Sequence, residues 1–147
     1  MRQFVCPACG AVNRTPDDKD ALAAKCGRCG HRLFTGEPVE VSDDQLASHE
    51  RSTKGAALLL DVWAPWCGPC RSMAPYYAAA ARQLEPGVRL LKLNSDAYPN
   101  AAARLGVSGI PALFLIEGGR VVARHAGLIT TDRIVAFARQ SQAARSA

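Results

Sequence analysis

The chain has no apolar run near the roughly 20 residues that a membrane-spanning helix needs, so we expect no membrane partner. Its first residues, Met-Arg-Gln-Phe-Val-Cys-Pro, contain no apolar core of the kind found in secretory signal peptides. Low-complexity segments are also absent. These absences favour a globular protein of the cytoplasm.

Dense clusters of lysine and arginine are missing as well, although the formal net charge of the 147 residues is +5. Three of these five charges fall in residues 1–36 and two in residues 37–147. A nucleic-acid surface usually concentrates its basic side chains on one face. We therefore interpret the charge as a solvated surface and predict no nucleic-acid partner.

Six cysteines stand out in a composition that is otherwise ordinary, with 48% apolar and 21% charged residues. The length allows one well-packed domain and a little more. Thiols stay reduced in the cytoplasm, where cysteines serve as metal ligands or catalytic groups more often than as structural disulfides. The positions of the cysteines therefore carry most of the functional information.

Four cysteines form two copies of one motif, Cys-Pro-Ala-Cys-Gly at residues 6–10 and Cys-Gly-Arg-Cys-Gly at residues 26–30. The glycine after each second cysteine suits a turn with positive φ whose backbone amides point back at the sulfurs. The spacing C-x2-C-x16-C-x2-C is typical of a tetrahedral zinc site. The predicted ligands of one structural Zn²⁺ ion are Cys6, Cys9, Cys26 and Cys29. Two disulfides, free thiols or a ligand role for His31 are the alternatives.

The segment that carries these motifs has too few large apolar side chains to fold on a core of its own. We expect zinc to fold it, with a short helical turn beginning at Thr15. The sequence Thr-Gly-Glu-Pro at residues 35–38 predicts a boundary. The prediction is therefore a zinc-binding module at residues 1–36 and a second domain at residues 37–147.

The other two cysteines, Cys67 and Cys70, follow an apolar stretch and open a helical pattern that ends at Leu84. We expect Cys67 on the exposed first turn of this helix, where unpaired N–H groups and the helix dipole favour a thiolate. Asp61 interrupts the apolar stretch, where desolvation would raise its pKa and let it exchange a proton near neutral pH. An acid at a strand end that reaches solvent is the alternative. The arrangement predicts a dithiol redox site.

Strands and helices alternate in the second domain, and a Gly-Gly turn at residues 118–119 predicts a final hairpin. We predict strands at 39–42, 57–63, 88–94, 112–117 and 120–126, and helices at 43–52, 68–84, 99–105 and 131–143. This order predicts an α/β fold with a mixed central sheet between two layers of helices.

The sequence Trp-Cys-Gly-Pro-Cys at residues 66–70 resembles the active site of the thioredoxin family. The resemblance covers roughly residues 37–141 and places Asp61 at the family's buried acid, Pro75 at its helix-kinking proline and Pro111 at its cis-proline. With its cysteine-rich segment the chain resembles the zinc-binding thioredoxins of the thioredoxin 2 type. The resemblance implies the thioredoxin fold, a small N-terminal zinc-knuckle module and protein-disulfide reductase activity.

By this resemblance Cys67 attacks a substrate disulfide, Cys70 resolves the mixed disulfide and Asp61 assists deprotonation of Cys70. The residues implied to receive the substrate are Trp66, Gly109, Ile110, Pro111 and Gly127. The chain has no nucleotide-binding fingerprint, so resetting the dithiol needs a partner, by resemblance an NADPH-dependent flavoprotein, thioredoxin reductase. Proteins that contain disulfides are the expected substrates, and a monomer is the expected state.

Several interpretations stay open at this stage. Lys92, in an apolar run, either pairs with Asp61 or extends its amine to solvent. Without the resemblance, Pro111 is a trans proline that starts a strand. The chain could be an oxidase or isomerase, although such relatives carry His where this chain has Pro69. It could also be a zinc-knuckle binding module with a vestigial redox domain, or its knuckle could release zinc on oxidation.

Overall fold

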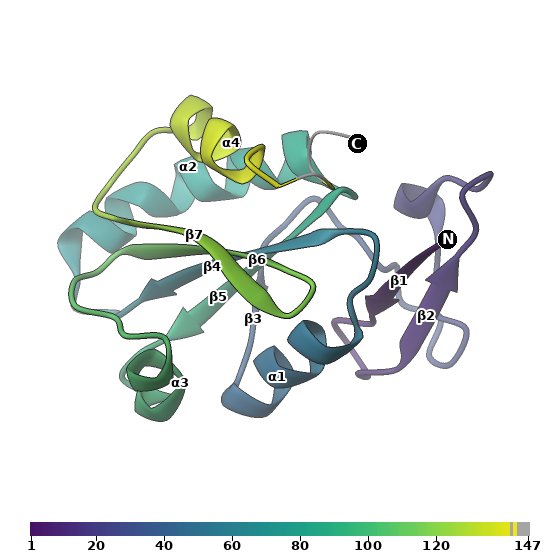
Figure 1. The fold of residues 1–147 in the computed structure, drawn as a ribbon, viewed down its shortest axis with the longest axis horizontal. Coiled ribbons are helices and arrows are strands. Elements are labelled where there is room, and N and C mark those ends of the chain that lie inside the picture. Colours follow the sequence, from purple (N-terminus) through teal and green to yellow (C-terminus); the bar gives the residue numbers. More distant parts are fainter. Residues whose placement is uncertain (142, 144–147) are drawn as a thin grey trace.

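The computed structural model describes residues 1–141 and 143, and its centre is a five-stranded mixed sheet in the order β3-β5-β4-β6-β7 (Figure 1). The strands are β3 (Val39–Glu40), β4 (Ala57–Trp63), β5 (Val88–Asn94), β6 (Ala112–Glu117) and β7 (Arg120–Ala126). Strands β3, β5 and β4 are parallel, whereas β6 is antiparallel to β4 and β7 is antiparallel to β6. The predicted mixed sheet is confirmed.

Two helices cover each face of the sheet, α2 and α4 on one side and α1 and α3 on the other (Figure 1). The helices are α1 (Asp43–Ser52), α2 (Gly68–Leu84), α3 (Pro99–Arg104) and α4 (Thr131–Ala138). Leu59 of β4 packs in the core beneath α2 and α4, while its neighbours Leu58 and Leu60 pack in the opposite core. Because both faces are covered, β4 is apolar at every position except Asp61, rather than alternating.

Most predicted boundaries are confirmed, and the differences have local causes. Strand β3 stops two residues early because Ser42 becomes the N-cap of α1: its Oγ accepts from the Gln45 amide at 3.2 Å, and the Gln45 side chain accepts from the Ser42 amide at 2.9 Å. Helix α4 ends at Ala138, five residues before its predicted end, and residue 142 of that prediction lies outside the described residues. Every helix in the described part of the chain is too short or too polar to span a bilayer.

The N-terminal segment is built on a hairpin of β1 (Arg2–Val5) and β2 (Val12–Thr15). The short helical turn predicted at residues 15–18 is not a helix: Thr15 is the last residue of β2, and a single turn follows in which the Lys19 amide donates to the Pro16 carbonyl at 3.1 Å. A 3₁₀ turn, η1 (Ala21–Ala23), follows instead, and the Asp20 carboxylate caps it by accepting from the Leu22 amide at 2.9 Å. β-Branched threonine fits a strand better than a helix start here.

This segment packs against the larger domain rather than standing apart from it. Its apolar cluster of Phe4, Cys6, Ala21, Cys26, Leu33 and Phe34 also includes Ala56, the residue before β4. Arg89 of β5 lies fully beneath the segment: its guanidinium stands 4.1 Å from the Phe34 ring centroid and donates to the Val5 carbonyl at 3.4 Å. The Gln3 side chain also donates to the Ser52 carbonyl at 2.7 Å. The small apolar core of the segment is therefore completed by residues of the larger domain.

Candidate functional site

The dithiol lies where β4 passes into α2. Cys67 is the N-cap of α2 and Cys70 lies in its first turn, and the two form a disulfide. The turn is held by a hydrogen bond from the Cys67 amide to the Ala64 carbonyl at 3.1 Å. The Cys67 sulfur accepts from the Cys70 amide at 3.2 Å, so it occupies the helix N-terminus, where a thiolate is favoured.

Access to the dithiol comes from a groove rather than from general exposure. Cys67 is 4% exposed and Cys70 is 2% exposed, so the expectation that Cys67 sits on an exposed turn is wrong in that simple form. Cys67, however, lines a groove of about 690 Å³, whereas Cys70 does not. The two cysteines therefore differ in access, with Cys67 the one that faces the groove.

The groove brings together four of the predicted site residues, Trp66, Cys67, Gly109 and Ile110. The Cys67 sulfur lies 3.9 Å from the Ile110 carbonyl oxygen, although the two residues are 43 positions apart in the chain. Trp66 is 68% exposed, and its indole N–H donates to the Asp96 carboxylate at 3.2 Å. This contact fixes the ring beside the groove, and no sequence motif predicts it.

The peptide bond before Pro111 is cis, as the resemblance implied, and not the trans bond of an ordinary strand start. Pro111 itself is buried. Gly127 does not line the groove; its amide donates to the Pro111 carbonyl at 2.8 Å, so it lies directly behind the groove floor. The far wall consists of residues that the sequence did not single out, namely Ser95, Ala102, Ala103, Val107 and Ser108.

Asp61 is fully buried, and neither of its carboxylate oxygens has a hydrogen-bond partner in the described part of the chain. Burial raises its pKa to about 7; Lys92 opposes this rise and Glu40 adds to it. The alternative of an acid that reaches solvent is therefore excluded. At neutral pH this carboxyl group is poised between its two protonation states.

The predicted pairing of Lys92 with Asp61 is wrong, and Lys92 is half-buried. It stands directly opposite Asp61 in the β4–β5 register, but within the described residues no ion pair joins them. Its amine instead lies 4.8 Å from the centroid of the Trp63 ring, a cation–π contact. Trp63 thus contacts Lys92 and also packs against the cluster of Ala64, Cys67 and Cys70.

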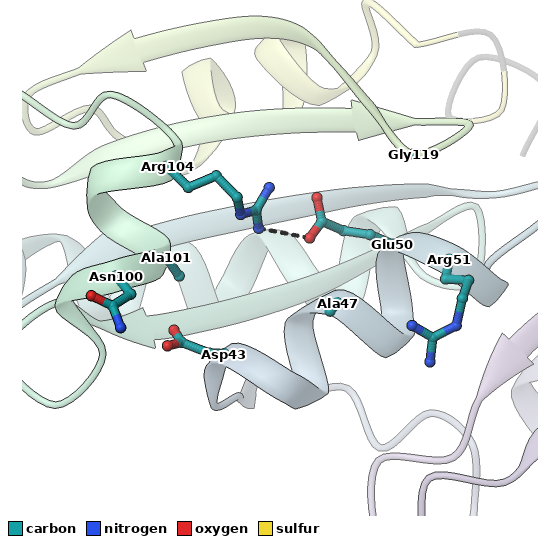
Figure 2. A pocket seen from close by; sticks show the side chains of 8 residues that line it. All are labelled: Asp43, Ala47, Glu50, Arg51, Asn100, Ala101, Arg104 and Gly119. Atoms are coloured by element: carbon teal, nitrogen blue, oxygen red, sulfur yellow. Dashed lines mark hydrogen bonds and ion pairs between the residues drawn. The ribbon is translucent and has the colours of Figure 1, made fainter.

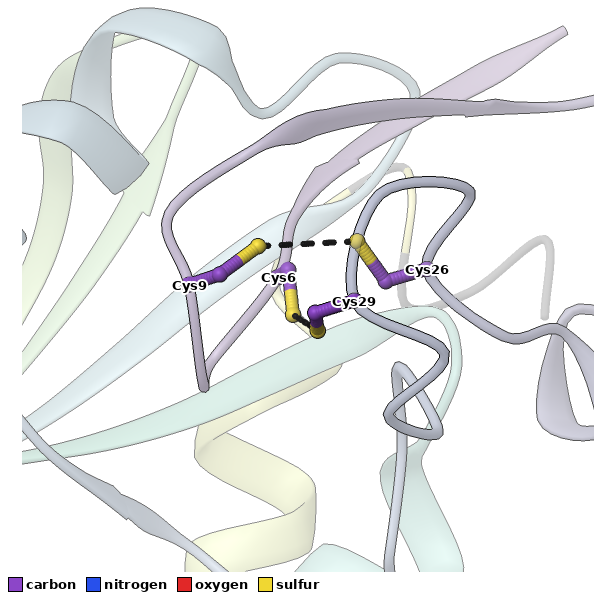
Figure 3. A group of neighbouring side chains, drawn as sticks. All are labelled: Cys6, Cys9, Cys26 and Cys29. Carbon is purple, nitrogen blue, oxygen red and sulfur yellow. Dashed lines mark hydrogen bonds between the residues drawn. The ribbon is translucent and has the colours of Figure 1, made fainter.

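The other four cysteines form one cluster (Figure 3), in which all sulfurs lie within 4.8 Å of one another. The Cys6–Cys29 and Cys9–Cys26 sulfur pairs are each 3.6 Å apart. Four thiolates about 2.3 Å from a tetrahedral Zn²⁺ would lie roughly 3.8 Å from one another, so the cluster fits one such ion. All four thiols are free, which excludes the two-disulfide alternative. His31 is not part of the cluster; its ring nitrogen contacts the Arg32 carbonyl at 2.6 Å.

Backbone amides converge on the cluster as the glycine-containing motifs predict. Gly10 and Gly30 have φ of 80° and 79°, and their amides close the two turns by donating to the carbonyls of Cys6 and Cys26. Within these turns the backbone amides of Ala8 and Arg28 donate to the Cys6 and Cys26 sulfurs, each at 3.4 Å. The sequence motifs did not point to Asn13, whose side-chain amide donates to the Cys26 sulfur at 3.4 Å. This hydrogen bond is the main reason why the pKa of the Cys26 thiol falls to about 6. A lowered pKa favours the thiolate that binds a metal.

A second hollow, of about 450 Å³, lies between α1, α3 and the β6–β7 turn (Figure 2). Arg104 and Glu50 point toward each other across it and form an ion pair at 2.9 Å. None of the six cysteines lines it. The hollow therefore has no part in the dithiol chemistry.

Known proteins resemble the chain over both of its parts. The family model described as Thioredoxin matches residues 38–140, and the model described as Thioredoxin 2, N-terminal, matches residues 5–31. Thioredoxin C-3 of Corynebacterium nephridii is 39% identical over 128 residues, which cover 87% of each chain. The thioredoxin of Allochromatium vinosum is 37% identical over 99 residues, which cover 67% of this chain and 92% of the relative. That of Chlamydia muridarum is 42% identical over 95 residues, 65% and 89% of the two chains.

Proposed function

Because the chain belongs to the thioredoxin family and carries the N-terminal module of thioredoxin 2 proteins, we propose that it reduces protein disulfides in the cytoplasm with Cys67 as the nucleophile. It is a thiol-disulfide oxidoreductase with a Cys-Gly-Pro-Cys dithiol and one structural zinc site. The single observation that carries the nucleophile assignment is that Cys67, and not Cys70, lines the groove.

The reaction transfers two electrons from the dithiol to the substrate. The Cys67 thiolate attacks one sulfur of a substrate disulfide, a Cys67–substrate disulfide forms, and the other substrate sulfur leaves as a thiolate that takes up a proton. The Cys70 thiolate then attacks the Cys67 sulfur, which releases the second substrate thiolate. The substrate disulfide ends as two thiols, and Cys67 and Cys70 end as the disulfide seen in the structure.

Asp61 accepts the proton of Cys70 before the second step. Two observations support this role: the Asp61 carboxylate is buried without a hydrogen-bond partner among the described residues, and its pKa is about 7. A pKa near 7 suits a base that works at neutral pH. The carboxyl group then gives this proton up to water, and the departing second substrate thiolate takes up a proton from water. Asp61 therefore acts on resolution of the mixed disulfide rather than on the first attack.

An extended segment of the substrate binds along the groove beside Ile110. Among the described residues, the Ile110 carbonyl oxygen has no backbone donor and faces the Cys67 sulfur, so it is available to a substrate amide. Trp66 and Gly109 form the exposed rim, while Pro111 and Gly127, which are joined by a backbone hydrogen bond, hold the chain that follows Ile110 in place. Backbone pairing of this kind holds the scissile disulfide near Cys67 without reading the substrate's side chains.

The direction of the reaction is reduction. Pro69 stands between the cysteines where oxidases and isomerases of the wider family carry histidine, and the four zinc-site cysteines are free thiols, as a reducing compartment requires. We propose that an NADPH-dependent flavoprotein, thioredoxin reductase, returns Cys67 and Cys70 to thiols, so that the chain carries electrons between the two proteins. We also propose that it works as a monomer.

Residues 1–36 form a zinc-dependent scaffold, and residues 37–147 hold the whole catalytic apparatus. The proposal rests on the location of every dithiol and groove residue beyond position 60, whereas the zinc ligands all lie before position 30. The zinc ion has four protein ligands and no open position, so it contributes folding free energy and no catalysis.

Trapping tests the nucleophile and the substrate class together. A Cys70→Ser variant keeps the attacking thiol but cannot resolve, so it should accumulate mixed disulfides with cytoplasmic proteins on Cys67. A Cys67→Ser variant is the matched control and should trap nothing. Faster alkylation of Cys70 than of Cys67 in the reduced protein, at neutral pH, would contradict the assignment.

A further inference from the structure

Three charged side chains lie in one row across three neighbouring strands. Glu40 of β3 is the register partner of Lys92 of β5, and Lys92 is the register partner of Asp61 of β4. Register partners project from the same face of a sheet, so Lys92 lies between the two acids. The row sits at the ends of the strands, beside the start of α2, where the dithiol lies.

The amine of Lys92 is not in direct contact with either acid in the described part of the chain. Its amine contacts the Trp63 ring, and within the described residues it forms no ion pair with Asp61 or Glu40. Asp61 is fully buried, whereas Glu40 is exposed; partial burial still raises the pKa of Glu40, and Lys92 opposes that rise. A solvated carboxylate holds its charge more easily than a buried one. At neutral pH Glu40 is therefore the acid that neutralises Lys92, and it leaves Asp61 less attraction than Lys92 alone would supply.

We propose that Glu40 is a positioning residue for the exchange reaction, an inference that rests on the proposed function. Because Glu40 shares the charge of Lys92, Asp61 stays basic enough to accept the proton of Cys70. Glu40 touches neither substrate nor sulfur and acts only through Asp61 and Lys92. Lys92 alone would hold Asp61 ionised and make it a weaker base.

The other titratable groups around Asp61 do not supply this effect. Tyr77 of α2 faces Asp61, but burial raises its pKa far above neutral, and its hydroxyl donates to two backbone carbonyls at 2.8 Å. His125 of β7 lies in the same row on the opposite side, beyond β6. The Cys67–Cys70 disulfide does not titrate. Glu40 is thus the acid on the Lys92 side of the row.

The size of the expected change in the pKa of Asp61 follows from the distance between the two carboxylates and from screening by solvent. Two strand spacings place the Glu40 and Asp61 carboxylates roughly 10 Å apart. At an effective dielectric constant of about 40–80, suited to a partly exposed charge, one unit charge at that distance changes a pKa by roughly 0.3–0.6. Removing the Glu40 charge should therefore lower the pKa of Asp61 by about that amount.

The test is an NMR titration of the Asp61 carboxyl carbon in the oxidised, zinc-loaded full chain, where no active-site thiol titrates with it. Glu40→Gln should lower the pKa of Asp61 by roughly 0.3–0.6, and high salt should shrink this difference because Glu40 is exposed. Glu40→Asp should restore most of the wild-type value. Glu37→Gln removes an equal charge from an exposed carboxylate nearby and should leave Asp61 unchanged. His125 is followed in the same samples, so its titration is separated from that of Asp61.

A kinetic measurement connects the titration to the reaction. The rate at which Cys70 resolves the mixed disulfide should fall on the acidic side of its pH profile. In Glu40→Gln this fall should occur at a pH lower by the same roughly 0.3–0.6 pH units, with the zinc content unchanged. An unchanged or raised pKa of Asp61, or an equal fall in Glu37→Gln, would overturn the role of Glu40. A shifted pKa with an unchanged pH profile of resolution would also overturn it. If the wild-type chain reduced no protein disulfide, the proposed function would fail separately, because the NMR titration needs no turnover.

Discussion

Replacing Asp61 with asparagine should stabilise the protein in a way that depends on pH. The substitution keeps the shape of the side chain and removes its charge. Asp61 is fully buried and neither oxygen has a hydrogen-bond partner within the part of the chain that the structure describes, so its ionised form is poorly compensated in the folded state. The fold should survive, because asparagine adds no atoms to the packed site.

The magnitude follows from the difference in proton affinity between the folded and unfolded chain. The carboxyl group has a pKa of 3.8 in its ordinary environment and about 7 in the folded protein. Since a tenfold change in proton affinity corresponds to about 1.4 kcal/mol, ionisation of Asp61 costs the folded state on the order of 4 kcal/mol above pH 7. A buried, unpaired amide costs about 1–3 kcal/mol, so the net gain in the variant should be roughly 1–3 kcal/mol.

The direction of the Asp61 pKa shift determines the pH range in which the stability of the wild type changes. Between about pH 4 and pH 7 the folded protein holds the Asp61 proton and the unfolded chain does not, so the wild type loses stability as pH rises through this range. Above pH 7 both states are ionised and the loss is complete. Below pH 4 both are protonated, and the variant should be no more stable than the wild type.

Urea unfolding of oxidised wild-type and Asp61→Asn proteins at intervals from pH 4 to pH 8.5 measures this difference. Near pH 4 the variant should be about 1–3 kcal/mol less stable than the wild type, because only the cost of the buried amide remains. Its relative stability should then rise by about 4 kcal/mol up to about pH 7 and stay constant above it. Asp18→Asn, which neutralises an exposed carboxylate in the zinc-binding segment, is the control and should show no such trend. A difference between Asp61→Asn and wild type that did not change with pH would refute the reasoning.

The remaining predictions concern turnover, zinc and the contact between the two parts of the chain. Asp61→Asn should slow resolution by Cys70 more than the first attack by Cys67, as measured by rapid mixing with a protein disulfide; equal slowing of both steps would argue against a proton acceptor for Cys70. Zinc removal, or Cys26→Ser, should unfold residues 1–36, allow proteolysis there and leave most reductase activity; activity lost in step with zinc would show that the modules depend on each other. Phe34→Ala removes a buried ring that contacts Phe4 edge to face at 4.9 Å and the Arg89 guanidinium, and it should cost about 3–5 kcal/mol of packing. The first segment should then be cleaved faster in the zinc-loaded protein, and unchanged cleavage would contradict the contact.

Features that depend on neighbouring residues could be predicted from the sequence. The zinc ligands were predictable because each pair lies within one tight turn, and the dithiol because a strand, a turn and a helix start follow one another without a gap. The burial of Asp61 was predicted, against an alternative that reaches solvent, from its apolar strand together with the dithiol that follows. In each case the physical cause lies within a few positions of the residue concerned, and the hydrophobic pattern alone sets the alternation of strands and helices.

Features that depend on register and packing were decided only by the tertiary structure. The groove exists because the chain returns to place Ile110 beside Cys67, and Asn13 reaches Cys26 only once the hairpin has formed. Lys92 rests on Trp63 because the parallel pairing of β4 and β5 brings those side chains together, and pairing with β3 adds Glu40 to the row. A shift of one residue in either register would turn every side chain to the opposite face, and local sequence does not specify that register.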